Sequence, residues 1–479
     1  MRSQSTLESD SVANKSCFVV YKDLRWGNEM QGLPMAPTSS VLDLVIQEVG
    51  DSSAQGIART ISGLITAGTI GPGDQLPTVR AVASGLGVSS STVSAAWRLM
   101  QNHGVIFTDR RRGTTVRSSR GSIEGRYWQV PVPQGTFEVD LSTGTPDSAL
   151  LPQIGTILKR IHANVAVGSY LDSPVLPDLE IELRRRWPFE PEHITVVDGA
   201  QDALDRLIGA LIQIGDRVIV EQPTFPPLLD MLELAGAEVI GVPLDDQGME
   251  LVAMRGALDV TPTAIFLQPR AHNPSGVSMS KRRAKAIAGL VPAETWIVED
   301  DHSGDASGID LHCLSAHRPE RSVLIHSYSK SHGPDLRIAA IGGAAAPLRT
   351  LERRRSLGPS WTSRLIQQIL LEMLTDADVE AQVQAAAATY LRRRNEFATA
   401  LATHGIELAT GAGLNMAIPV QDEQVAVIYL AANSIGAAPG RPFLVEPTDQ
   451  DFIRLSIGSH RGSAVELANV VATAARSGS

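Results

Sequence analysis

Apolar runs of strand length alternate with amphipathic stretches of helix length through most of the chain after Asp140. Two such units read Ile194–Val197, Gln201–Ile214 and Arg217–Val220, then Ala264–Leu267, Lys281–Leu290 and Trp296–Val298. A strand that runs parallel to its predecessor needs a long crossover, which is usually a helix. The alternation therefore predicts an α/β domain built on a mainly parallel sheet. After about residue 379 one long helix, Val379–Leu401, and short strands predict a smaller α+β subdomain.

The length of 479 residues suggests about three domains. Residues 1–37 are polar and irregular and form a predicted mobile arm. Residues 119–138, rich in Ser, Gly, Arg and Pro, form a predicted linker. We therefore expect one folded domain over residues 38–118 and another over residues 139–479. The second would divide into a large subdomain, about 139–375, and a small one, about 376–479.

Charge is unevenly distributed along the chain. The net charge is −10, yet residues 51–120 contain eight arginines, no lysine and three acidic residues. That window is therefore +5 and the remainder is −15. A basic module on an acidic body is expected when one part of a protein contacts phosphates, as in nucleic-acid binding. The alternative is a chance fluctuation over a short window.

The apolar runs, the N-terminus and the cysteine content together indicate the cellular compartment of the protein. No apolar run approaches the roughly 20 residues of a membrane-spanning helix, and the N-terminus lacks the apolar core of a signal peptide. Cys17 and Cys313 are the two cysteines, which argues against a disulfide scaffold and favours a reducing cytoplasm. Neither cysteine has a metal-ligand partner at a useful spacing, so we expect no zinc site.

Two short helices joined by a glycine-containing turn are predicted within the basic window. The first begins near Pro77 and buries a stripe that includes Val82. The turn is residues 85–88, and Ser89 or Ser90 caps a second helix that buries Val93 and Trp97. This is the helix-turn-helix pattern, whose second helix enters the major groove of DNA. Residues 104–116 read as a two-stranded wing with a basic tip. Helices over residues 41–49 and 54–67 are expected before this pair.

The stretch of about residues 54–116 resembles the winged helix-turn-helix of GntR-family transcription regulators. The resemblance rests on Leu76-Pro77 with Arg80, on Val88 with Thr92-Val93, and on the Arg112-Gly113-Thr114 wing. It implies DNA contacts by Arg80, Ser90, Ser91, Thr92, Arg110, Arg111, Arg112 and Gly113. Family members often carry arginines where this chain has Ser90 and Ser94, so phosphate contacts would supply much of the affinity. A winged helix used for protein contacts is the alternative.

Lys330 lies on a tight turn directly after the apolar run 323–325. It is flanked by Ser327 and Ser329, and Arg337 follows seven residues later. Lysine normally keeps its ammonium in water. Here an amine stands beside hydroxyls and a guanidinium, which suit a phosphate monoester, and pyridoxal phosphate (PLP) needs this combination. The other five lysines lie in the arm or on amphipathic helices, so Lys330 has little competition as the Schiff-base residue.

Other candidate groups also follow strands, where open α/β sheets bind ligands. Gly199, Ala200 and Gln201 open a helix whose N–H groups can bind phosphate. Phe225 can stack on a pyridine ring or simply pack in the core, and Asn273 can bind the phenolic oxygen or be an ordinary turn residue. One of the acids in 299–301 can keep the pyridine nitrogen protonated. Arg454, in an apolar strand, needs either a ligand carboxylate or an internal salt bridge.

Residues 138–475 resemble the fold-type I aminotransferase domain, and the whole chain resembles the MocR/GntR-type regulators. The motifs are Ser-x-Ser-Lys with a later Arg, Asn-Pro-x-Gly, and Glu-Asp-Asp. The resemblance implies an internal aldimine at Lys330, Asp300 on the pyridine nitrogen, and Arg454 on a ligand carboxylate. It places the remaining cofactor contacts at Gly199, Ala200, Gln201, Phe225, Asn273, His302, Ser327, Ser329 and Arg337. Tyr170 would reach the phosphate of a neighbouring subunit.

Two residues depart from that pattern, because many relatives have tyrosine where this chain has His302 and Phe225. An imidazole can still donate one hydrogen bond, and its ordinary pKa lies near neutral pH. We expect the loss of the phenols to matter more for turnover than for holding PLP.

The leading interpretation is a PLP-dependent, cytoplasmic transcription regulator that senses an amino compound or PLP itself. The resemblance implies a head-to-tail homodimer that binds an operator with repeated half-sites. The alternative is a working aminotransferase with a vestigial or protein-binding head. A third possibility is a scaffold that does not bind PLP.

Overall fold

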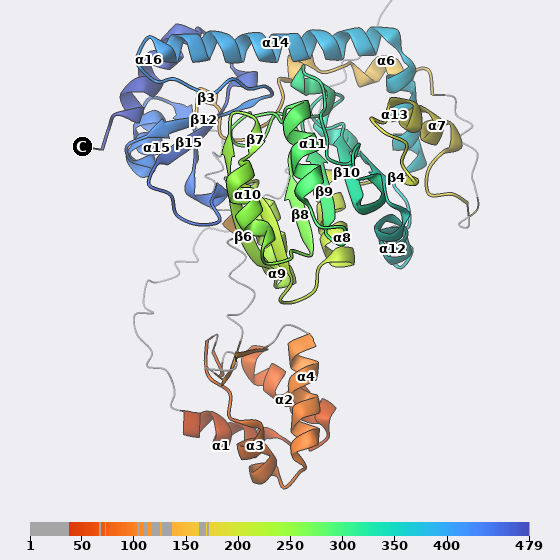
Figure 1. The fold of residues 1–479 in the computed structure, drawn as a ribbon, viewed down its shortest axis with the longest axis vertical. Coiled ribbons are helices and arrows are strands. Elements are labelled where there is room, and N and C mark those ends of the chain that lie inside the picture. The colour runs from red at the N-terminus through yellow and green to blue at the C-terminus, as the bar shows by residue number, and fades with distance from the viewer. Residues whose placement is uncertain are drawn as a thin grey trace, which may run out of the picture. The chain divides into compact units, whose positions relative to one another are not determined.

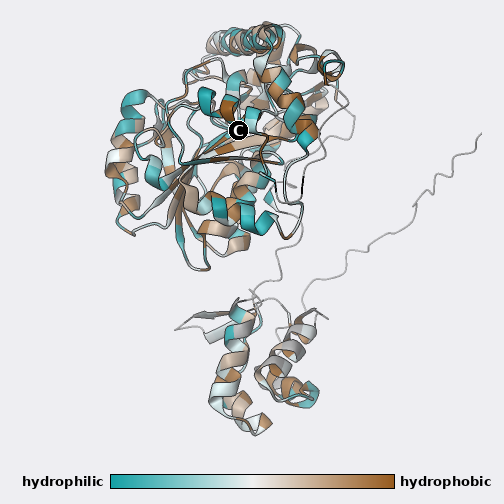
Figure 2. Ribbon diagram, turned by 90° about the vertical axis from the view of Figure 1, so that its right-hand side faces the viewer, coloured by the Kyte–Doolittle hydropathy of each residue, from teal (hydrophilic) through white to brown (hydrophobic). Residues whose placement is uncertain are grey.

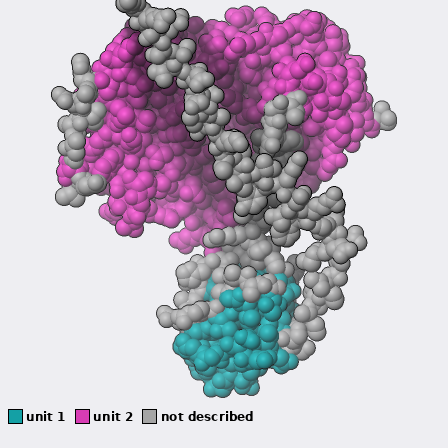
Figure 3. Space-filling view, turned by 180° about the vertical axis from the view of Figure 1, so that it is seen from behind, with its two compact units in different colours: residues 1–119 teal, residues 120–479 magenta. Residues whose placement is uncertain are grey.

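The computed structural model describes residues 38–66, 69–71, 73–102, 106–109, 113–116, 125–126, 137–161, 169 and 172–478. The predicted arm, the wing tip 110–112 and Tyr170 lie outside these residues. The chain divides into two compact units, residues 1–119 and 120–479 (Figure 3). Each unit is described by itself below.

The N-terminal unit contains the predicted helix pair and hairpin. Its elements are α1 (Thr38–Glu48), α2 (Ala54–Thr66), α3 (Val79–Leu86), α4 (Ser90–Asn102), β1 (Ile106–Asp109) and β2 (Gly113–Val116). The Thr78 side chain caps α3, and Gly87 ends it at φ 67°. The Ser89 hydroxyl accepts from the backbone N–H of Thr92 at 3.1 Å, which identifies Ser89 as the cap of α4. Val82, Val93 and Trp97 are buried between the helices.

The second unit is built on an eight-stranded sheet (Figure 1). The strands, in sheet order, are β4 (His193–Val197), β11 (Ala339–Gly343), β10 (Ser322–Ser327), β9 (Trp296–Asp301), β8 (Ala264–Leu267), β5 (Arg217–Gln222), β6 (Glu238–Asp245) and β7 (Gly248–Met249). The neighbours from β10 to β6 pair in parallel, whereas β11 and β7 are antiparallel to their neighbours. The prediction of a mainly parallel sheet is confirmed.

Helices cover both faces of this sheet, which explains why its strands read as continuous apolar runs. Along β5, Val218 and Val220 face α8 (Ala200–Leu211), α9 (Pro226–Ala235) and α12 (Ala345–Arg355). Ile219 points to the opposite face, where α10 (Leu251–Leu258) and α11 (Lys281–Leu290) pack. The other helices of the large subdomain are α6 (Ile154–Leu158), α7 (Pro177–Arg186) and α13 (Arg364–Thr375).

The C-terminal subdomain is a three-stranded antiparallel sheet covered by helices. Its elements are α14 (Ala377–Ala402), β12 (Asn415–Val420), α15 (Glu423–Ala432), β14 (Ala438–Pro439), β15 (Asp451–Ser456) and α16 (Ala464–Ala475). The predicted long helix is α14, which Asp376 caps. A short parallel pair joins β3 (Val139–Asp140) to β13 (Ile435–Gly436), so the start of the second unit is tied to its C-terminal part.

Hydrophilic and hydrophobic residues lie side by side along most helices (Figure 2), as expected when one helix face packs on a core. Within the residues described above, no helix is both long and apolar enough to cross a membrane. Because β4, β10, β9, β8 and β5 share one direction, their carboxyl ends meet at a single edge of the sheet. The predicted cofactor residues follow these ends.

Candidate cofactor and DNA-binding sites

A cavity of about 360 Å³ opens at the carboxyl edge of the large sheet. Its walls come from the ends of the parallel strands and from the C-terminal subdomain. The structure brings these predicted residues together around it: Ala200, Gln201, Phe225, Asn273, Asp300, His302, Ser327, Ser329, Lys330, Arg337 and Arg454. Of the other predicted cofactor contacts, Gly199 directly precedes Ala200, and Tyr170 lies outside the described residues.

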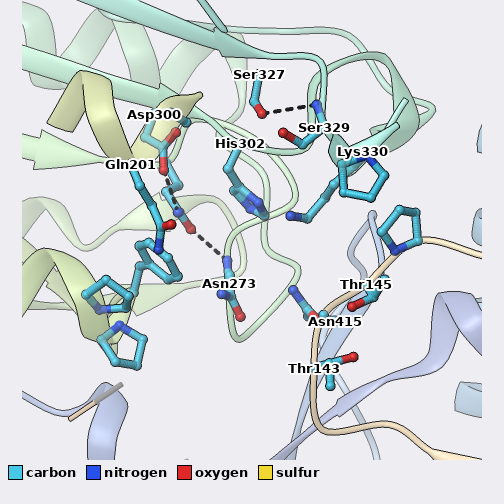
Figure 4. A pocket seen from close by; sticks show the side chains of 18 of the residues that line it. Thr143, Thr145, Gln201, Asn273, Asp300, His302, Ser327, Ser329, Lys330 and Asn415 are labelled. Atoms are coloured by element: carbon cyan, nitrogen blue, oxygen red, sulfur yellow. Dashed lines mark hydrogen bonds between the residues drawn. The ribbon is translucent and has the colours of Figure 1, made fainter. Parts of the chain in front are cut away.

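Lys330 lies on the turn after β10, and its side chain extends toward His302 (Figure 4). Burial lowers the pKa of the Lys330 ammonium, although the carboxylate of Asp300 works in the opposite direction and Arg454 adds to the lowering. Because its pKa is lowered, a larger fraction of Lys330 is the neutral, nucleophilic amine than in an exposed lysine.

Only one of the three consecutive acids at the end of β9 lines the cavity. Glu299 is engaged by the backbone N–H groups of Leu314 and Ser315 at 2.7 and 2.8 Å. Asp301 receives two 2.8 Å hydrogen bonds from Arg270. Successive residues of a strand point to opposite faces, so Asp300 alone projects toward the cavity.

The surroundings of Asp301 and Asp300 shift the pKa values of these two carboxyl groups in opposite directions. Burial alone would raise the pKa of Asp301, but Arg270 and His326 hold it well below its usual range. Burial works against the charged form of His326 as well, yet its hydrogen bonds to Asp301 and Asp305 raise its pKa to about 9. Burial raises the pKa of Asp300 to about 6, and a hydrogen bond from Gln268 only partly offsets this.

Asp300 has an unsatisfied oxygen. Its Oδ2 accepts from Gln268 Nε2 at 3.1 Å, whereas its buried Oδ1 has no hydrogen-bond partner among the described residues. The Oδ1 of Asn273 is also buried and lacks such a partner. Buried polar atoms are rarely left unpaired unless a ligand or water completes them. A protonated ring nitrogen would satisfy Asp300, so the cavity fits PLP by its own chemistry.

Gln268 is a functional residue that the sequence interpretation missed. Its Oε1 accepts from the backbone N–H of Asn273 at 2.8 Å, so its Nε2 must be the end that faces Asp300. Its own backbone N–H donates to the buried Glu221 at 2.8 Å. Gln268 therefore sets the position of both Asp300 and the Asn273 turn. The available signal was its place directly after β8, at the same sheet edge as Asp300.

The expectation that His302 titrates near neutral pH is wrong. Burial, with the nearby charge of Lys330, lowers the pKa of His302 to about 3, so the ring is neutral. Its Nε2 lies 2.9 Å from the carbonyl oxygen of Ala271 and must donate to it. The Nδ1 of a neutral ring then carries a lone pair. His302 lines the cavity as an acceptor, not as the donor that a tyrosine would supply.

The expected phosphate end is assembled from three segments. Gly199 precedes α8 at φ 101°, a conformation that suits glycine. The Arg337 guanidinium lies against it, because a Cβ built on Gly199 would be 3.5 Å from Arg337 Cζ. Ser327 Oγ accepts from the backbone N–H of Ser329 at 3.4 Å. A helix N-terminus, two hydroxyls and a guanidinium thus converge, as a phosphate site requires.

Arg454 is held by neutral groups. Its guanidinium donates to the carbonyl of Ser142 and lies 3.3 Å from both Asn415 Oδ1 and Ser456 Oγ. Among the described residues no carboxylate forms an ion pair with Arg454, so the alternative of an internal salt bridge has no partner in that part of the chain. Burial lowers its pKa to about 10, and its Nε has no partner among those residues. A ligand carboxylate would satisfy it.

Several residues that line the cavity could not be inferred as site residues from the motifs. One loop beside Arg454 contains Thr143, Gly144 and Thr145. Asn415 and Phe443 of the C-terminal subdomain also line the cavity. Gly144 has φ 69°, and a Cβ there would lie 2.9 Å from Arg454 Nη1. This loop carries no strand pattern and no glycine-rich phosphate signature, so no motif marks it as part of a site.

The predicted DNA contacts that the structure describes lie on the surface of the N-terminal unit. Arg80 on α3 is exposed, as are Ser90 and Ser91 at the start of α4. The hydroxyl of Ser89 is 2.7 Å from that of Ser91 and 2.8 Å from that of Thr92. These hydroxyls therefore form one connected group. Gly113 begins β2 at φ 80°, and Arg110, Arg111 and Arg112 lie outside the described residues.

Comparison with known proteins agrees with both parts of this description. Residues 138–471 match the family described as aminotransferase class I and II. Residues 53–116 match the bacterial regulatory proteins of the gntR family.

Relatives with assigned names share most of the chain. The vitamin B6 salvage pathway transcriptional repressor PtsJ of Salmonella typhimurium is 32% identical over 81% of this chain and 90% of its own length. The pyridoxine biosynthesis transcriptional regulator PdxR of Corynebacterium glutamicum is 26% identical over 71% and 76%.

Solved structures share the fold of the larger part. A kynurenine aminotransferase from Pyrococcus horikoshii covers 71% of this chain and 91% of its own, with a TM-score of 0.63 and 21% identity. The α-aminoadipate aminotransferase LysN from Thermus thermophilus covers 73% and 96%, with a TM-score of 0.64 and 19% identity. At these identities the likeness shows the fold.

The chain therefore belongs to the aminotransferase class I and II family and carries a gntR-family segment ahead of that domain. This combination defines a DNA-binding transcription regulator with a PLP-binding, aminotransferase-like domain.

Replacing Gln268 by Leu tests its positioning role. The variant removes the donor to Asp300 Oδ2 and the acceptor of the Asn273 N–H. We expect PLP to bind about 10- to 100-fold more weakly, since each lost hydrogen bond to a buried charged group costs about 1.5–3 kcal/mol. The pKa of Asp300 should also rise. The measurement is the PLP dissociation constant, by visible absorption, as a function of pH.

A matched control is Gln367→Leu. Gln367 is also fully buried and makes three hydrogen bonds to backbone groups, but it does not line the cavity. Equal loss of PLP affinity in both variants would show that the Gln268 effect is general destabilisation.

Proposed function

We propose that PLP, or an amino compound bound beside it, occupies the cavity and biases how the N-terminal unit binds DNA. The observation that carries this is that Lys330 and Asp300 line the same cavity. Lys330 is an amine of lowered pKa, and Asp300 is a buried carboxylate with one oxygen that lacks a hydrogen-bond partner among the described residues. A chain that joins such a cavity to a gntR-family segment can couple ligand occupancy to DNA binding, provided that the ligand prefers one arrangement of the protein.

Each chemical group of PLP has candidate partners among the residues that line the cavity. Lys330 Nζ would supply the amine for the aldehyde of PLP, and Asp300 Oδ1 would accept a hydrogen bond from the protonated ring nitrogen. Gln201, Ser327, Ser329, Arg337 and the N-terminus of α8 would hold the phosphate, and Phe225 would pack on the ring. Asn273 would bind the phenolic oxygen. When bound, PLP supplies an electron sink and a reactive carbonyl for amines.

Two classes of effector are supported. The names of the relatives PtsJ and PdxR refer to vitamin B6 salvage and to pyridoxine biosynthesis. This supports PLP itself as a signal of vitamin B6 supply, in a regulator of the MocR type. Arg454, which has no carboxylate partner among the described residues, supports an amino acid as a second effector class.

We further propose a head-to-tail homodimer that acts in the cytoplasm, the compartment where a bacterial regulator meets DNA. Two exposed leucines support self-association: Leu357, which follows α12, is 91% exposed, and Leu365 in α13 is 47% exposed. A dimer would place two heads on repeated half-sites of an operator. Tyr170 would then contact the phosphate in the partner subunit.

The pH dependence of PLP binding tests Asp300. Its pKa in the protein without PLP is raised to about 6, so the carboxylate that pairs with the protonated ring nitrogen is lost below that pH. We expect PLP affinity to fall about tenfold per pH unit below pH 6. Since the phosphate of PLP titrates in the same range, the quantity to compare is the difference between wild type and Asp300→Asn. A constant ratio of the two affinities from pH 5 to 8 would contradict the assignment.

Replacing Arg80 by Ala tests the DNA-binding face. Arg80 is exposed on α3 and is not among the residues that line the cavity. If Arg80 contacts a phosphate, the variant should bind DNA from upstream of the protein's own gene more weakly. The slope of log affinity against log salt concentration should also decrease by about one counterion. Visible absorption by bound PLP should not change. Steady keto-acid production by a protein that shows no salt-sensitive DNA binding would instead favour the aminotransferase alternative.

A further inference from the structure

Part of the predicted linker makes defined contacts with the cofactor-binding unit. Within residues 119–138 the structure describes Gly125 and Arg126. The backbone N–H of Arg126 donates to Asp230 Oδ1 at 3.0 Å, and its Nη1 donates to Glu233 Oε2 at 2.8 Å. Nη1 also lies 3.6 Å from Asp230 Oδ1. Both acids are on α9.

The backbone approaches α9 closely at this point. A Cβ built on Gly125 would lie 2.6 Å from Asp230 Oδ2, so only glycine fits without a shift of that carboxylate. The Asp230 side chain is 20% exposed and that of Glu233 is 73% exposed. The contact therefore combines a main-chain hydrogen bond, a guanidinium–carboxylate pair and a glycine that permits both.

The same helix borders the cavity at its other end. Phe225 is the N-cap of α9, and Phe225, Pro226 and Pro227 all line the cavity. Asp230 and Glu233 follow within the next two turns of the helix. A helix of ten residues is about 15 Å long, so the cavity-lining residues and the two acids lie on one short element. One end of α9 thus contacts whatever fills the cavity, and the other part binds the linker.

We propose that α9 transmits occupancy of the cavity to the linker, with Arg126 as a latch on Asp230 and Glu233. The inference rests on the proposed function, because the linker leads in sequence to the DNA-binding unit. A ring stacked on Phe225 fixes the first turn of α9 and holds the two acids in place for Arg126. When the cavity is empty that turn is less constrained, and the latch opens more often.

The strength of the contact suits a switch. Partly exposed ion pairs are weak and change the equilibrium between open and closed forms by only a few-fold. A small shift of α9 is therefore enough to alter the latch. A deeply buried pair would stay closed in both states.

The linker sequence offers a direct assay. Residues Ile123-Glu124-Gly125-Arg126 are the sequence after which the protease factor Xa cleaves. Cleavage of the full-length protein would give fragments 1–126 and 127–479. A latched Arg126 is protected, so the rate of cleavage reports the latch without any knowledge of the operator.

We expect saturating PLP to slow the cleavage of the wild-type protein about 2- to 5-fold. The Asp230→Asn/Glu233→Gln variant keeps the protease site intact but removes the acids. It should be cleaved faster than wild type, at one rate with and without PLP. Glu233→Gln alone, at an exposed position that folding does not need, should show a smaller change in the same direction. Glu238→Gln, which removes an exposed acid that pairs with Arg217, is the matched control and should behave as wild type.

Two outcomes would overturn the proposal while leaving the proposed function in place. One is wild-type cleavage that PLP does not change although visible absorption shows PLP bound. The other is equal cleavage rates for wild type and both α9 variants. Absence of bound PLP under any condition would instead remove the proposed function, and the latch with it.

Discussion

The buried carboxylate of Asp300 is the constraint on which the rest of the site depends. Its two neighbours in sequence are already satisfied, Glu299 by backbone N–H groups and Asp301 by Arg270 and His326. Within the described part of the chain, one oxygen of Asp300 has no hydrogen-bond partner, and burial raises the pKa of this carboxyl group. A buried carboxylate is costly unless something cationic completes it. In our proposal the protonated ring of PLP would do this, and Lys330 stands close enough to influence the same charge.

The sheet explains why these groups meet. Parallel strands end at one edge, so residues far apart in sequence, such as Asp300 and Lys330, line one cavity. The helix α9 starts at the same edge with Phe225 and leads away from it toward Arg126 of the linker. One helix therefore carries both a part of the cavity wall and the two acids that bind Arg126. The C-terminal subdomain closes the cavity with Arg454 and Asn415.

Much of this could be predicted, because periodicity and strand ends are local signals. The helix pair of the N-terminal unit, the strands β4, β5, β8 and β9, and the place of Lys330 all follow from such signals. What the sequence could not resolve depended on side-chain direction. The residues alone did not distinguish the acids 299–301; the family resemblance implied Asp300, and the strand pleat supplies the physical reason. Gln268 acts through neighbours distant in sequence, and the neutral state of His302 comes from burial and from the carbonyl of Ala271.

The most direct test of the central claim is the affinity of the full-length protein for DNA from upstream of its own gene, measured at fixed salt with and without saturating PLP. The account predicts a change of about 5- to 150-fold in wild type, the usual range of coupling between two sites, and a much smaller change in Lys330→Ala. An unchanged affinity in wild-type protein whose visible absorption shows that PLP is bound would contradict it.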